Sequence, residues 1–169
     1  MALALQPRRH VSYPSPEFPG PPTIGLSIPD TWLTIGPDAY LQPDRKVDLA
    51  VCAPSPVDGV TPSIAATVIR TLPAEDPERL LTDLVADDVA QVPGSELVVS
   101  RYQSRPRPTA CCVLRSRRPG KLMEHLQILT YVHDERLAHL VHLTGVYAAD
   151  SEAGRAAVYD ILGPVGAER

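Results

Sequence analysis

Two long, largely apolar runs decide the fold of this chain: Leu122-Met-Glu-His-Leu-Gln-Ile-Leu-Thr-Tyr-Val-His133 and Arg136-Leu-Ala-His-Leu-Val-His-Leu-Thr-Gly-Val-Tyr147. β-Branched and aromatic residues are frequent in both runs, and the polar pair Asp134-Glu135 separates them, which predicts the two strands of a hairpin. Two shorter runs, Glu96–Tyr102 and Thr109–Arg115, precede them. The four segments together predict an antiparallel sheet, and they leave little loop in which a catalytic site could be built.

Two helices are predicted around these strands. The first begins with Asp76 as a capping residue and Pro77 in the first turn, and Leu and Val then recur at three- and four-residue steps up to Val92. The second covers Ser151 to Leu162 and ends at Gly163-Pro164. Helices with one apolar face are expected to pack on the sheet.

Proline separates the start of the chain from the rest. Five prolines fall within residues 14–22, and each removes a backbone donor and disfavours helix in the residue before it. We therefore predict an extended, flexible arm over residues 1–21, one domain over residues 22–165 and a short tail over residues 166–169. Within the domain, Thr23–Ile35, Val47–Ala53 and Ser63–Leu72 predict further strands.

The overall composition excludes several classes of protein. A chain of 169 residues is long enough for one domain with a real core. A net charge of −4 argues against a nucleic-acid-binding protein, which needs surplus positive charge to displace counterions from phosphates. The three cysteines, Cys52, Cys111 and Cys112, form no disulfide or zinc-ligand pattern, and we interpret them as buried apolar side chains.

The first residues do not resemble an export signal. Only five apolar residues precede Pro7, and Arg8-Arg9 follows them, whereas a secretory signal has its positive charges before a longer apolar run. No apolar run approaches the length that spans a membrane. We therefore expect a cytoplasmic protein without membrane insertion.

Charge is distributed unevenly along the chain. Residues 101–121 contain seven basic residues and no acidic one, while residues 75–96 contain seven acidic residues and one arginine. Blocks of one sign can steer a partner of the opposite sign, although solvated strand ends and helix faces carry charge in any protein. The candidate partner-binding residues are Arg105, Arg107, Arg115, Arg117, Arg118 and Lys121.

We predict no catalytic residue, no metal site and no cofactor site. The Gly-x-Ser-x-Gly nucleophile motif and the glycine-rich phosphate-binding motifs are absent. A metal site at His125, Glu124 and His142 is a weaker alternative, because His125 could approach Val141 or His142 across the hairpin, depending on its register. A reactive cysteine among nearby arginines is an equally weak one.

The order of these segments resembles a known fold. Leu26-Ser-Ile-Pro-Asp-Thr-Trp32 is similar to the first hairpin of the PsbP-like fold, in which a strand is followed by Pro-x-x-Trp. The helix that begins Pro77-Glu-Arg-Leu-Leu81, the antiparallel strands after it and the closing helix follow the same order. Within that fold, residues 22–165 are most similar to the LpqN/LpqT-like proteins of actinobacteria. Those envelope members carry a signal and a lipidated cysteine, neither of which this sequence shows.

The resemblance implies an α+β fold in which an antiparallel β-sheet is flanked by helices, a PsbP-like α/β/α sandwich. Members of the fold are mostly non-enzymatic, and they include photosystem subunits, a nuclear import factor, envelope lipoproteins and chaperones of secreted effectors. We therefore expect a non-catalytic adaptor of the bacterial cytosol that binds another protein, with a secretion-linked chaperone as one form of this role. The alternative is a protein that binds an apolar small molecule between the sheet and the helix over residues 77–92. An enzyme is the weakest reading, and an exposed edge strand leaves a homodimer open.

Overall fold

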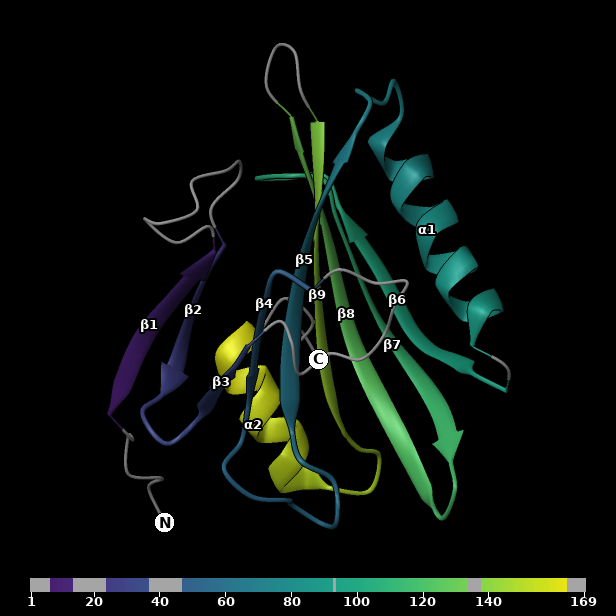
Figure 1. Cartoon of the computed structure of the whole chain (residues 1–169). Coiled ribbons are helices and arrows are strands. Elements are labelled where there is room, and N and C mark those ends of the chain that lie inside the picture. Colours follow the sequence, from purple (N-terminus) through teal and green to yellow (C-terminus); the bar gives the residue numbers. More distant parts are fainter. Residues whose placement is uncertain (1–6, 14–23, 37–46, 93, 134–137, 164–169) are drawn as a thin grey trace.

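One antiparallel sheet of seven strands forms the body of the protein. The computed structural model describes residues 7–13, 24–36, 47–92, 94–133 and 138–163. The strands lie side by side in the order β3-β4-β5-β9-β8-β7-β6 (Figure 1). Their bounds are β3 (Leu33–Ile35), β4 (Leu49–Cys52), β5 (Ser63–Thr71), β6 (Glu96–Gln103), β7 (Thr109–Arg118), β8 (Lys121–His133) and β9 (Ala138–Ala148). The predicted antiparallel sheet is confirmed, and β5 lies in its interior between β4 and β9.

A separate two-stranded ribbon precedes the sheet. It pairs β1 (Arg8–Tyr13) with β2 (Ile24–Pro29) in antiparallel register. The prediction of a flexible arm over residues 1–21 is therefore wrong for residues 8–13. The reason is that β2 offers its backbone to a second strand, while Val11 packs on the core and Arg8 forms an ion pair with Asp160. The predicted tail, residues 166–169, lies outside the described residues.

The two helices lie on opposite faces of the sheet. Helix α1 (Pro77–Gln91) packs on β7 and β8, and α2 (Glu152–Leu162) packs on β9 and on β2 of the ribbon (Figure 1). Side chains alternate between the two faces along each strand. On β7, for example, Cys111 belongs to the core under α2, whereas Cys112 belongs to the core under α1. Both thiols are free and buried, as the sequence predicts for them.

Local signals place the helix ends where the sequence predicts them. The Asp76 carboxylate accepts a hydrogen bond from the backbone N–H of Arg79 at 3.0 Å, and Pro77 occupies the first turn. The Ser151 hydroxyl caps α2 by accepting from the N–H of Gly154 at 2.9 Å. At the other end of α2, Gly163 adopts a positive φ of 76° and its N–H bonds to the carbonyl of Tyr159.

Gly145 allows α2 to approach the sheet closely, and Trp32 helps to close the core beside the helix. Gly145 on β9 lies directly beneath the helix, because a Cβ at this position would collide with the side chain of Val158. Trp32 is 5% exposed and packs in the same core. The α2 side of the sheet is therefore closed by the helix, the ribbon and this tryptophan.

The interface between α1 and the sheet is filled by side chains. Leu81 and Val85 of the helix are buried against Leu129, Tyr131 and Leu140 of the sheet. This is the place where the sequence suggests an apolar ligand as an alternative. The described residues there form a continuous packed cluster, so a ligand would have to displace core side chains.

Candidate functional site

The candidate site lies at the closed end of the hairpin formed by β7 and β8. The two strands pair without interruption from Thr109 opposite Thr130 to Arg118 opposite Lys121. Pro119 and Gly120 make the turn, and Gly120 has a φ of 75°. A proline followed by a residue of positive φ is typical of a type II turn. This geometry brings arginines on β7 opposite charged and apolar residues on β8.

The structure divides the six predicted partner-binding residues into two groups. Arg115, Arg117, Arg118 and Lys121 lie together at the closed end of the hairpin. Arg105 and Arg107 lie in the connection before β7, at the opposite end of that strand. Residues 109 and 117 are eight residues apart along β7, which corresponds to about 26 Å at roughly 3.3 Å per residue, and Arg105 and Arg107 come before residue 109. The six residues therefore do not form one surface.

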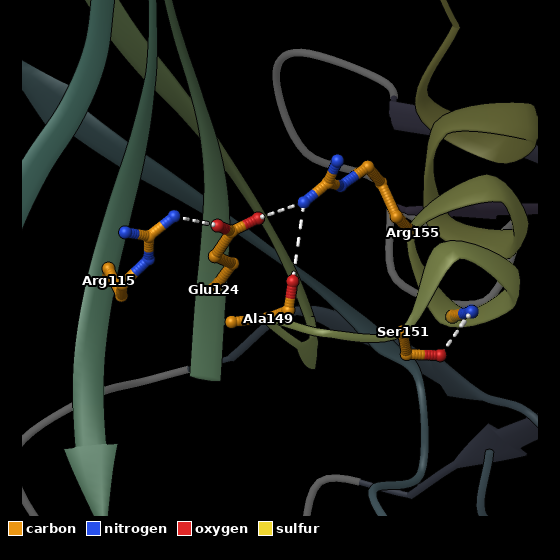
Figure 2. Close-up of polar contacts among 6 residues, drawn as sticks. Arg115, Glu124, Ala149, Ser151 and Arg155 are labelled. Carbon is orange, nitrogen blue, oxygen red and sulfur yellow. Dashed lines mark hydrogen bonds and ion pairs between the residues drawn. The ribbon is translucent and has the colours of Figure 1, made fainter. Parts of the chain in front are cut away.

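A fourth arginine, Arg155, joins the closed end of the hairpin from α2. Glu124 on β8 lies directly opposite Arg115, whose Nη2 donates to Glu124 Oε1 at 2.8 Å. Arg155 Nη2 donates to Glu124 Oε2 at 3.1 Å (Figure 2). The Glu124 side chain is only 4% exposed, while the side chains of Arg115 and Arg155 are 33% and 48% exposed. We call Arg115, Arg117, Arg118, Lys121 and Arg155, with Glu124 between them, the hairpin site.

Two guanidinium groups share one carboxylate in this site. The hydrogen bond to Glu124 raises the pKa of Arg115. Partial burial lowers the pKa of Arg155, but the interactions with Glu124 and Tyr147 together outweigh it, so the net shift of this pKa is upward. The Arg155 guanidinium also lies 5.9 Å from the ring centre of Tyr147, where the π electrons attract it. Both arginines therefore stay charged, so Arg115, Glu124 and Arg155 together carry one net positive charge. Glu96, which lies opposite Arg115 across the β6–β7 ladder, offsets part of it.

The remaining basic residues of the hairpin site differ in their contacts and exposure. Lys121 Nζ donates to the backbone carbonyl of Asp58 at 2.6 Å, which ties the hairpin to the loop between β4 and β5. Arg117 and Arg118 are exposed on the last two residues of β7. These two arginines are therefore the part of the site that projects furthest toward solvent.

Glu124 and Arg155 are missing from the group that the sequence indicates for partner binding. The pairing of Arg115 with Glu124 could have been found, because a two-residue Pro-Gly turn between Arg118 and Lys121 sets this register. No local signal could have found Arg155, since it lies 31 residues from Glu124 and meets it only after α2 packs on the sheet.

The weaker metal-site alternative is not supported by the hairpin register. His125 lies opposite Val146, and His142 lies opposite Leu129, so the two imidazoles are four positions apart on the β8–β9 ladder. The side chain of Glu124 points to the α2 face, away from both histidines. Within the part of the chain that the structure describes, no three His, Cys, Asp or Glu side chains are placed to hold a metal ion.

The potential nucleophiles sit in unreactive surroundings. Burial raises the pKa of the Cys112 thiol to about 12, with smaller contributions from Cys111 and Asp88, so this thiol stays protonated near neutral pH. The Ser116 hydroxyl lies 2.8 Å from His125 Nε2, but Ser116 is buried at 6% exposure. Burial, followed by the charge of Arg118, lowers the pKa of His125.

Comparisons with known proteins show the fold. No family model matches the chain, and no curated protein matches it in sequence. Among solved structures it is similar to LpqN of Mycobacterium tuberculosis, a protein involved in cell envelope biogenesis, with a TM-score of 0.63, 16% identity, and coverage of 90% of this chain and 84% of that one. It is also similar to PA94, a Pseudomonas aeruginosa protein of unknown function, with a TM-score of 0.50, 12% identity, and coverage of 89% and 88%. The chain therefore has an LpqN-like fold. Among the described helices, none is long and apolar enough to cross a membrane.

Proposed function

We propose that this chain is a non-catalytic interaction protein that binds an acidic segment of another protein at the hairpin site. The observation that carries the proposal is the carboxylate of Glu124, which accepts hydrogen bonds from both Arg115 and Arg155 and so holds them in place. The three side chains together carry one net positive charge. Arg117, two residues further along β7, adds an exposed charge on the same face, and Arg118 adds a second exposed charge that projects to the α1 side of the hairpin end. Such a surface is preorganised, so a partner meets arginines whose positions are already set.

Arginine favours carboxylates as ligands. Its planar guanidinium offers several N–H donors in a fixed fork, and charge-assisted hydrogen bonds of this kind are about twice as strong as neutral ones. The whole chain carries a net charge of −4, so the hairpin site is a local positive region on an acidic protein. A nucleic acid would be repelled by most of the remaining surface, whereas a short acidic segment needs only the site itself.

The surroundings of the nucleophiles support binding over catalysis. Cys112 is held as a thiol, and Ser116, which contacts His125, is buried. The cytosolic setting and the role as a chaperone for a secreted protein are further parts of this proposal, suggested by the PsbP-like resemblance. The LpqN-like fold by itself is compatible with other settings.

The experiment is quantitative capture of a partner by the tagged full-length protein from a lysate of the source cells, followed by binding measurements with the purified partner. The test variant is Arg117→Glu/Arg118→Glu. Its matched control is Arg105→Glu/Arg107→Glu, which makes the same change of charge at the opposite end of β7.

We expect at least a tenfold weaker affinity for the test variant, less than a twofold change for the control, and an affinity that falls with added salt. Equal losses in both variants would mean that net charge, and not the hairpin site, controls binding. A partner that binds all three proteins equally would refute the proposal.

A further inference from the structure

Strand β6 is the long open edge of the sheet. It pairs with β7 on one side, and among the described residues no strand pairs with its other side (Figure 1). Seven of its eight residues are exposed, including Leu97 at 42%, Val98 at 39% and Val99 at 42%. The opposite edge, β3, is only three residues long. A long, apolar edge is a template on which another strand can form, and a very short edge is not.

The edge carries little of the protection that proteins usually place there. Edge strands are commonly blunted by lysine, by proline or by a bulge. Glu96–Gln103 contains neither lysine nor proline. It has one irregularity, because the register with β7 skips Val98 between Leu97 and Val99. This bulge is the one such device in β6, and the Val98 side chain at the bulge is itself exposed and apolar.

The charges on β6 specify the direction of pairing. Glu96 lies before the apolar triplet Leu97-Val98-Val99, and Arg101 lies after it. In an antiparallel pair of two copies, Glu96 of each strand comes next to Arg101 of the other, so two opposite-charge pairs form by symmetry. Because Val98 is the extra residue of the bulge, Glu96 and Arg101 lie on the same face of the sheet, and Val99 is the middle position of the ladder between them, which places it at the twofold axis. A parallel arrangement would instead place like charges side by side.

We propose that β6 is a self-association edge, through which two copies of this chain pair in antiparallel fashion and join their sheets into one. The buried core of the contact is the apolar triplet, and the ends are the two pairs of Glu96 with Arg101. One short strand pair is at the low end of specific interfaces, so the dimer forms and dissociates with concentration. The contact adjoins the hairpin site, because Glu96 lies opposite Arg115 across the β6–β7 ladder, but it uses the outer edge of β6, which no residue of the hairpin site occupies.

Analytical ultracentrifugation of the full chain over a wide concentration range tests the proposal. The wild type is expected to move from monomer to dimer, and Val98→Lys is expected to stay monomeric. The matched control is Leu72→Lys, the introduction of the same charge at an exposed apolar residue outside β6. Because Glu96 also faces Arg115 across the β6–β7 ladder, the thermal stability of each variant is measured alongside.

A charge exchange makes the test specific. Glu96→Arg and Arg101→Glu are each expected to weaken the dimer at least tenfold, and the double variant Glu96→Arg/Arg101→Glu is expected to recover most of the loss. Hydrogen exchange of the β6 amides should slow as concentration rises. A wild type that is monomeric throughout, a dimer that survives Val98→Lys, or a double variant no better than the singles would overturn the proposal. If the monomer instead binds a foreign segment that Val98→Lys abolishes, the edge serves another protein and the self-pairing is wrong.

Discussion

Replacing Glu124 with glutamine is the sharpest test of how the hairpin site is held together. The change keeps the size of the side chain but removes the charge that Arg115 and Arg155 share at 2.8 and 3.1 Å. A hydrogen bond to a charged group contributes about 1.5–3 kcal/mol. Removing one partner of a fully buried ion pair costs about 3–5 kcal/mol. Both arginines here are partly exposed and can turn toward water, and glutamine still accepts one hydrogen bond, so we expect a loss of about 2 kcal/mol.

The assay is urea unfolding followed by circular dichroism, with the free energy of unfolding obtained by linear extrapolation. For a protein of this size a loss of about 2 kcal/mol corresponds to a melting temperature lower by about 4–8 °C. Glu75→Gln is the matched control, because Glu75 is exposed and the chemical change is identical; we expect an effect within about 0.5 kcal/mol. If Glu124→Gln behaved like this control, Glu124 would not be holding α2 to the sheet, and the preorganised hairpin site would lose its basis.

Three further predictions concern the core and the buried titratable groups. Gly145→Ala should destabilise by about 1–3 kcal/mol in the same unfolding assay, because the new methyl group overpacks the contact with α2, whereas Gly36→Ala has open space and should not. The wild type should lose stability as the pH falls below about 6.5. The reason is that the pKa of His125 is lowered in the folded state, so the unfolded chain binds a proton that the folded one does not. In a titration of the free energy of unfolding against pH, His125→Gln should flatten this part of the curve, and an unchanged slope would contradict the role given to His125. Thiol labelling at pH 8 should modify the half-buried Cys52 first and leave Cys112 unmodified until the protein unfolds. The reason is that Cys112 is buried and burial raises its pKa to about 12. Rapid labelling of Cys112 in the folded protein would show that its surroundings are open.

The sequence by itself determined the secondary structure of most of the chain. The alternation of buried and exposed residues on β2, the capping residue Asp76 and the two long strands β8 and β9 can all be read within a few residues of each element. These signals are local because hydrogen bonding within a turn, helix capping and side-chain alternation involve near neighbours. The fold class followed from the order of the elements, and the LpqN-like fold agrees with it.

Only the tertiary structure decided which charges meet. The six basic residues are close together in the sequence, but β7 separates Arg105 and Arg107 from the other four. Arg155, in contrast, lies 31 residues after Glu124 in the sequence and meets it because α2 packs on the sheet. Tertiary structure also decided the place of β1. The neighbouring prolines predict a flexible arm there, whereas β1 pairs with β2. Contacts of this kind depend on how strands and helices pack over long sequence separations, and no pattern within a short window contains that information.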